Sequence, residues 1–197
     1  HAGCRHADSL ENLANERARR LFGADHANLQ PHSGVSANLA VYFSVLDVGD
    51  RILSMKLSHG GHLSHGDPSS VTSHCFKFRH YGLDAQTEQI DYEEVRRIAE
   101  EFKPHMIIAG ASSYPRLIDY QIMAEVARSV SAYLLVDMAH IAGLVAAGVI
   151  PSPVPHADFV TFTTYKTLKG GRGGVILCKK EHAGKISKTI FPGAQGT

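Results

Sequence analysis

The stretch that decides the fold is residues 158–174, DFVTFTTYKTLKGGRGG. Residues 159–164 are an apolar, β-branched run of the kind that forms a buried strand. Lys166 follows almost at once, and glycines crowd the chain beyond it. An amine at the edge of a buried strand is partly desolvated, which favours the neutral form that attacks a carbonyl. The same residues also fit an ordinary solvated lysine at a strand end, because lysines are nearly always exposed.

A second stretch favours the chemical interpretation. Residues 133–140, YLLVDMAH, form another apolar strand, and it ends in the carboxylate of Asp137. Parallel sheets place ligands at the carboxyl ends of their strands, so we expect Asp137 and Lys166 at the same edge. Pyridoxal phosphate uses such a pair, because its aldehyde forms a Schiff base with a lysine and its ring nitrogen needs an acidic partner. The two strands therefore predict a pyridoxal-phosphate site.

The composition narrows the class of protein. With 197 residues and 44% apolar content, the chain is long enough to bury one core. Its net charge of +1 gives no electrostatic case for nucleic acid or an acidic membrane surface. The cysteines are far apart and odd in number, which favours a reducing compartment, the cytoplasm, over a disulfide framework. No signal peptide is visible, but the chain opens at His1, and a removed leader stays an open alternative.

The rest of the chain alternates between the periodicities of helices and strands. Helices are predicted over residues 8–22, 35–46, 91–102, 119–130, 141–147 and 181–189. Strands are predicted over residues 51–55, 71–81, 106–111, 133–137, 159–164 and 174–178. Asp8, Asp91 and Asp119 are the expected helix caps, and residues 27–30 and 191–197 the expected connections. This order predicts an α/β fold, a three-layer αβα sandwich with a mostly parallel sheet.

Two loops offer further binding groups. Residues 31–34, PHSG, lead into a helix whose free N–H groups suit a phosphate, although a plain helix cap is the commoner role of such residues. Residues 57–68, LSHGGHLSHGDP, carry histidines at a spacing of three, which a metal site would use on a helix. The glycines disfavour a helix, and no cysteine or acid completes a ligand set, so no metal is predicted. An imidazole laid over a flat aromatic ring is the alternative.

With these residues assembled, the sequence resembles serine hydroxymethyltransferase, a family of pyridoxal-phosphate enzymes with the aspartate-aminotransferase fold, fold type I. The resemblance runs nearly end to end and rests on short motifs at residues 3–4, 21–24, 30–34, 59–63, 136–148, 166–168, 172–174 and 191–193. Each motif is weak alone, and together they are specific. The resemblance implies interconversion of serine and glycine with tetrahydrofolate as the one-carbon acceptor, in a homodimer with shared active sites.

The resemblance implies a role for each matching position. The groups expected at the reacting centre are Lys166 as the Schiff-base lysine, Asp137 beside the ring nitrogen, His62 stacked on the ring, His140 and Arg172. The further cofactor contacts are Ser33 and Gly34 at the phosphate, Ser112 and Tyr165, with Gly196 reaching the phosphate of a neighbouring subunit. The folate pocket would be lined by Leu57, Gly61, His62 and Leu63.

The sequence departs from the family pattern at several positions: Tyr165 stands in place of a histidine, Val35 in place of a serine, Phe162 within a threonine run, and Ala194 and Thr197 in place of glycines. Two alternatives stay open for this reason. One is a related pyridoxal-phosphate enzyme, either a threonine aldolase or transaldolase or an enzyme of the α-methylserine type. The other is a non-catalytic fragment that binds the cofactor.

The resemblance covers only the middle of such an enzyme. Residues 1–197 would be the large, cofactor-binding domain, without the N-terminal segment and without the C-terminal small domain that carries the carboxylate-binding arginine. His1 falls near a position where the family has a tyrosine that reaches the partner's site. We expect either an excerpt of a longer protein or a chain that works with another one.

Overall fold

The structure, a computed structural model, describes residues 3–196. His1 and Thr197, which the sequence comparison singled out, lie outside the described residues. One seven-stranded sheet has the strand order β1-β7-β6-β5-β4-β2-β3. Its strands are β1 (His26–Asn28), β2 (Arg51–Met55), β3 (Lys77–Tyr81), β4 (Met106–Ala109), β5 (Tyr133–Asp137), β6 (Phe159–Thr163) and β7 (Gly174–Cys178).

The sheet is mostly parallel. β3, β2, β4, β5 and β6 run in one direction, whereas β7 is antiparallel to β6, and β1 is antiparallel to β7. Every residue of β4, β6 and β7 is buried, as expected for strands covered on both faces. The register sets Asp137 opposite Thr161, which fixes how the ends of β5 and β6 lie side by side.

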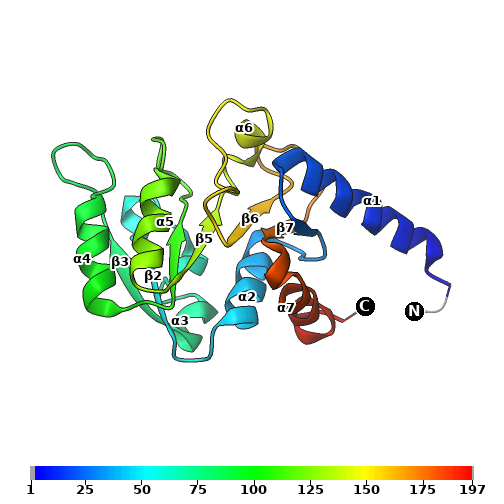
Figure 1. Cartoon of the computed structure of the whole chain (residues 1–197), viewed down its shortest axis with the longest axis horizontal. Coiled ribbons are helices and arrows are strands. Elements are labelled where there is room, and N and C mark those ends of the chain that lie inside the picture. Colours follow the sequence, from blue (N-terminus) through cyan, green and yellow to red (C-terminus); the bar gives the residue numbers. More distant parts are fainter. Residues whose placement is uncertain (1–2, 197) are drawn as a thin grey trace.

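Helices cover both faces of the sheet (Figure 1). One face packs against α2 (Gly34–Val45) and α7 (Ala183–Lys188). The other face packs against α1 (Arg5–Phe22), α4 (Tyr92–Phe102), α5 (Tyr120–Ser129) and α6 (Ala142–Ala146). These layers confirm the predicted αβα sandwich. α1 reaches beyond the sheet at one end of the molecule and leaves three leucines exposed: Leu10, Leu13 and Leu21.

The prediction of one strand over residues 71–81 is wrong. Its first part is a short helix, α3 (Val71–Cys75), and only β3 is extended. Ser70 explains the difference, because its side chain accepts a hydrogen bond from the Thr72 N–H and so starts a helical turn. Three short 3₁₀ turns lie between the longer elements: η1 (Leu57–His59), η2 (Leu63–His65) and η3 (Lys180–His182). The expected connection over residues 191–197 is helical in its first part, because the π-helical segment η4 (Thr189–Ala194) extends into it.

The helix caps were predicted with mixed success. Asp91 and Asp119 accept hydrogen bonds from Glu94 and Ile122 and cap α4 and α5, as expected. The prediction for Asp8 is wrong, since α1 begins at Arg5 and Asp8 lies within its first turn. There its negative charge still lies near the positive end of the helix dipole.

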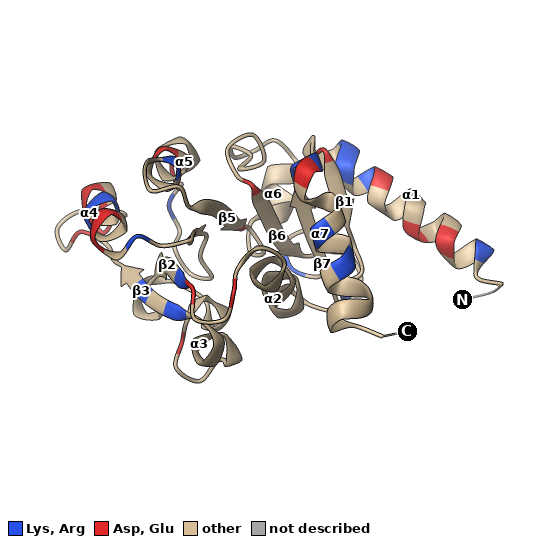
Figure 2. Cartoon of the chain, turned by 60° about the horizontal axis from the view of Figure 1, so that its bottom comes forward, with Lys and Arg blue, Asp and Glu red and all other residues tan. Residues whose placement is uncertain are grey.

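Charged side chains follow the outer helices. They stand along α1 and α4, whereas α2 carries none over its whole length (Figure 2). α2 can lack charges because its middle is buried against the sheet, with Val41 and Tyr42 fully covered. Among the described residues, no helix is both long enough and apolar enough for a membrane span.

Candidate active site

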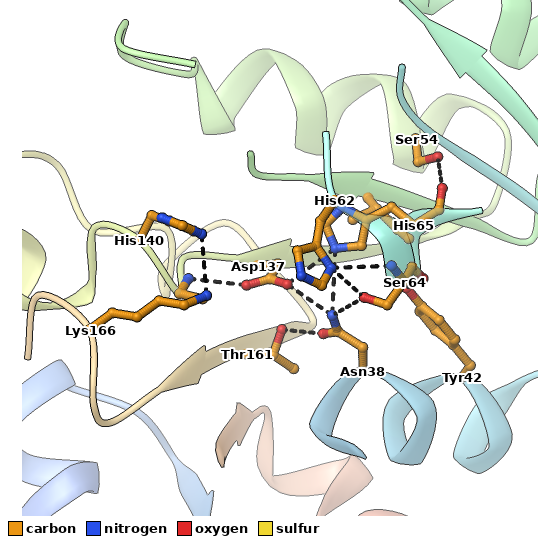
Figure 3. Close-up of polar contacts among 12 residues, drawn as sticks. Asn38, Tyr42, Ser54, His62, Ser64, His65, Asp137, His140, Thr161 and Lys166 are labelled. Carbon is orange, nitrogen blue, oxygen red and sulfur yellow. Dashed lines mark hydrogen bonds and ion pairs between the residues drawn. The ribbon is translucent and has the colours of Figure 1, made fainter. Parts of the chain in front are cut away.

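The predicted groups gather at the carboxyl ends of four parallel strands. β2 leads into the histidine loop, β4 into the segment with Ser112, β5 ends at Asp137, and β6 leads to Lys166. Side chains from separate parts of the chain meet there because parallel strands share one end. In Figure 3, Lys166 and His140 approach Asp137 from one side, and His62, His65 and Asn38 from the other.

Lys166 is half-buried and points its amine at a histidine. Its Nζ lies 3.2 Å from Nε2 of His140. Burial lowers the pKa of His140, and the positive charge of Lys166 lowers it further, so the imidazole is neutral and can accept a hydrogen bond from the amine. The lysine loop is closed at its base, where the Gly170 N–H donates to the Thr164 carbonyl at 2.6 Å.

Asp137 is a buried carboxylate with three N–H donors. Oδ2 accepts from Nδ2 of Asn38 at 2.8 Å and from Nε2 of His65 at 3.1 Å, and Oδ1 accepts from the Ala139 N–H at 3.0 Å. Burial alone would raise the pKa of Asp137, but these donors, His65 foremost, outweigh it and hold the pKa well below its ordinary value. The carboxylate is therefore a fixed negative charge inside the protein.

His62 is oriented by the turn that follows it. Its Nδ1 accepts hydrogen bonds from Ser64, from the N–H at 3.2 Å and from Oγ at 2.8 Å. Burial lowers the pKa of His62, and the nearby charge of His65 lowers it further, which favours a neutral ring. A neutral, half-buried imidazole held in one orientation suits stacking on a flat ligand.

The histidines do not form the group that their spacing suggested. His59 turns away and accepts a hydrogen bond from the Leu83 N–H at 2.9 Å. His62, His65 and Asp137 instead bring three ligand atoms within 4.8 Å of one another. Two of these atoms, Nε2 of His65 and Oδ2 of Asp137, are hydrogen-bonded to each other at 3.1 Å.

The start of α2 is capped by its own side chains. Ser33 accepts from the Ser36 N–H, and Ser36 Oγ accepts from the Ser33 N–H at 2.8 Å. Ser33 and Ser36 therefore form a reciprocal cap at the start of α2. Gly34 packs tightly, since a Cβ there would lie 2.9 Å from the Thr163 methyl group. The first N–H groups of α2 have no partner within the helix, as at every helix start.

Tyr165 and Arg172 form a pair beside the lysine. The Arg172 guanidinium lies 4.6 Å from the centroid of the Tyr165 ring, within the range of a cation–π contact. The contact thus joins the residue before Lys166 to the arginine at the other end of the same loop.

The remaining predicted residues lie around the histidine loop, with one exception. Leu57 and Leu63 are both about half exposed, and Gly61 packs so closely that a Cβ would lie 2.5 Å from the Met55 carbonyl. The Ser112 N–H donates to the Gly60 carbonyl at 2.7 Å, which ties the segment after β4 to this loop. The exception is Gly196, which is exposed in the last segment of the chain.

Sequence reasoning missed three residues at this site: Asn38, His65 as the partner of Asp137, and Thr161. The available signal was an asparagine within an uncharged, apolar helix, because a buried amide needs hydrogen-bond partners.

A comparison with family models gives the context for this geometry. The model of serine hydroxymethyltransferase matches residues 1–197, the whole chain. That family consists of pyridoxal-phosphate enzymes of fold type I, in agreement with the mixed, mostly parallel sheet between two layers of helices. The chain belongs to the serine hydroxymethyltransferase family.

Proposed function

We propose that this protein uses pyridoxal phosphate to interconvert serine and glycine, with tetrahydrofolate as the one-carbon acceptor. One observation carries the proposal. The neighbouring strands β5 and β6 bring a buried, negatively charged Asp137 and the amine of Lys166, paired with His140, to one edge of the sheet. When bound, the cofactor supplies an aldehyde for an amine and a ring that accepts electrons from a carbanion.

The residues around this edge fit the cofactor, and residues 1–197 would form its binding domain. Asp137 offers the fixed negative charge that a protonated ring nitrogen requires. His62 offers a neutral imidazole for stacking, and His140 keeps the Lys166 amine hydrogen-bonded until a carbonyl arrives. Ser33 and Gly34, with the free N–H groups at the start of α2, would hold the phosphate.

A folate site beside the cofactor is supported by the histidine loop. Leu57 and Leu63 are exposed on either side of Gly61, whose lack of a side chain allows close backbone approach. Leu57 also lines a hollow of about 350 Å³, together with Met55, His62 and Pro68. Exposed apolar side chains around a hollow suit a flat, partly apolar ligand such as a pterin.

A second copy of the chain is the proposed partner. The leucines on α1 are exposed on a helix that reaches beyond the sheet (Figure 1), and such surfaces favour association. Gly196 is exposed in the last segment, where it would approach the site of the other copy. All three cysteines are free, which supports the cytoplasm as the location.

A second candidate function is favoured by the pair of Tyr165 and Arg172. The residue before Lys166 is Tyr165, whose ring makes a cation–π contact with Arg172. A phenol therefore stands where the resemblance implies an imidazole. An enzyme with that change would act on threonine-like or α-methylated β-hydroxy amino acids, by aldol cleavage or by transfer.

The test combines cofactor uptake with substrate turnover. We would titrate the purified protein with pyridoxal phosphate, record the visible absorbance, and then follow amino acid products with and without tetrahydrofolate. Serine turnover that requires folate supports the first function, and turnover of threonine or α-methylserine alone supports the second. Cofactor uptake without any turnover would overturn both and favour a non-catalytic binding fragment.

A further inference from the structure

One buried polar side chain has no role in the proposed function. Asn38 lies in the middle of α2, fully buried in a helix that is otherwise apolar on its covered face. A buried amide is costly unless its hydrogen bonds are made, so its contacts show what it holds together.

Asn38 contacts three other segments of the chain (Figure 3). Its Nδ2 donates to Oδ2 of Asp137 at 2.8 Å, on β5, and to Oγ of Ser64 at 3.0 Å, in η2. Its Oδ1 accepts from Oγ1 of Thr161 at 2.6 Å, on β6. A carboxylate can only accept, so the amide nitrogen must face Asp137 and the amide oxygen must face Thr161.

These contacts reach the parts of the protein that would hold the cofactor. Ser64 links Asn38 to His62, because its Oγ is also hydrogen-bonded to Nδ1 of that ring at 2.8 Å. Thr161 belongs to the strand that delivers Lys166. Asn38 itself lies on the helix that begins beside Ser33. One amide therefore connects the proposed contacts for the phosphate, the ring face, the ring nitrogen and the aldehyde.

We propose that Asn38 is a positioning residue, oriented by Thr161, that fixes the Asp137 carboxylate and the His62 ring relative to each other. This inference rests on the proposed function, since the group that both side chains would face is pyridoxal phosphate. Asn38 would act only through its neighbours. It orients the carboxylate and supports its negative charge, and thereby keeps a proton on the ring nitrogen.

Two substitutions test the inference, with two matched controls. Asn38→Ala removes the hydrogen bonds to Asp137, Ser64 and Thr161. Thr161→Val removes the hydroxyl that orients the amide while keeping the side chain's shape. Thr161→Ser keeps that hydroxyl and should rescue. Tyr42→Phe controls for lost buried polarity, because Tyr42 lies on the same helix and donates to the Ser64 carbonyl at 3.1 Å without touching Asp137.

The measurements are the affinity for pyridoxal phosphate and the ¹⁵N resonance of cofactor labelled at its ring nitrogen. A lost hydrogen bond to a charged group predicts binding about 10- to 100-fold weaker for Asn38→Ala and Thr161→Val. We expect their ring nitrogen to shift toward the resonance of an unprotonated pyridine. A loss of general packing would not move that resonance. Thr161→Ser and Tyr42→Phe should match the wild type.

The outcomes separate the two proposals. If the wild type takes up no pyridoxal phosphate, the proposed function fails and the inference fails with it. If the wild type binds while Asn38→Ala and Thr161→Val bind equally well with unshifted nitrogen, only the inference is overturned. The inference would also be overturned if Tyr42→Phe lost as much affinity for pyridoxal phosphate as Asn38→Ala and showed the same shift of the ring nitrogen. Should Asn38→Ala not fold, the contrast between the valine and serine variants at Thr161 decides.

Discussion

Replacing Asp137 by asparagine tests the charge at the centre of the site. The substitution keeps the size of the side chain and removes its negative charge. Its two oxygens now serve three donors: Asn38 at 2.8 Å, His65 at 3.1 Å and the Ala139 N–H at 3.0 Å. An amide has one oxygen, so at least one of these buried donors would face an NH₂ group.

The substitution is expected to lower both the folding stability and the turnover. One unpaired buried donor costs about 1–3 kcal/mol of folding stability, which for a chain of this length lowers Tm by about 3–10 °C. The functional loss is larger, because two opposite charges about 4 Å apart attract each other by about 4 kcal/mol near a protein surface. That difference corresponds to about a thousandfold loss in turnover.

The assay is thermal unfolding without cofactor, followed by serine turnover with saturating pyridoxal phosphate. Asp158→Asn is the matched control, since Asp158 lies at the other end of β6, accepts from the Leu134 N–H at 2.8 Å and pairs with Lys179. The control should lose stability and keep its turnover. Wild-type turnover in Asp137→Asn would refute the role given to the carboxylate, and an unchanged Tm would refute the account of its donors.

Three further predictions concern other parts of the chain. Lys166→Ala should prevent borohydride from fixing pyridoxal phosphate to the protein, measured by mass spectrometry, and fixation at the wild-type level would exclude Lys166 as the attachment site. Burial lowers the pKa of His182 from its ordinary value of 6.5. As the pH falls, this histidine therefore takes up a proton in the unfolded chain before it does so in the folded chain, and the folded state loses stability below about pH 6.5. His182→Leu should therefore shrink the difference in Tm between about pH 7.5 and about pH 5.5, and an unchanged difference would contradict this. At Gly110, φ is +127° and an added Cβ would lie 2.1 Å from the Asp137 carbonyl. Gly110→Ala should therefore lower the free energy of unfolding, measured by chemical denaturation, by about 2–6 kcal/mol. Gly148 has a φ of +69° and open space around it, so Gly148→Ala should lower the free energy of unfolding much less. Equal losses of stability in the two variants would argue against the steric clash as the cause.

The sequence is sufficient to predict the positions of side chains that directly follow apolar strands. Asp137 and Lys166 could be assigned to one edge because β5 and β6 are mostly apolar, β-branched or aromatic runs, and their parallel direction follows from the alternation with helices. The strand positions alone do not determine which side chains support Asp137. Asn38 is almost a hundred positions from Asp137 in sequence, and only the packing of α2 onto the sheet brings them together.

Short elements were predicted less well, for local physical reasons. A cap at Ser70 turned the start of an apparent strand into α3. β1 has three residues, too few to show any alternation, and pairing with β7 is what makes it a strand. The pair of Tyr165 and Arg172 depends on how a glycine-rich loop folds back, which periodicity does not describe.

The pairing of β1 with β7 also sets an order of events during synthesis. His26 lies opposite Cys178, so all residues up to β7 must leave the ribosome before β1 meets its neighbour. Until then, β1 cannot join the sheet, and α1 lacks the docked strand on which it rests. Nascent chains arrested before residue 174 should therefore be cut by proteases within residues 5–28, whereas chains released after residue 178 should resist cleavage there.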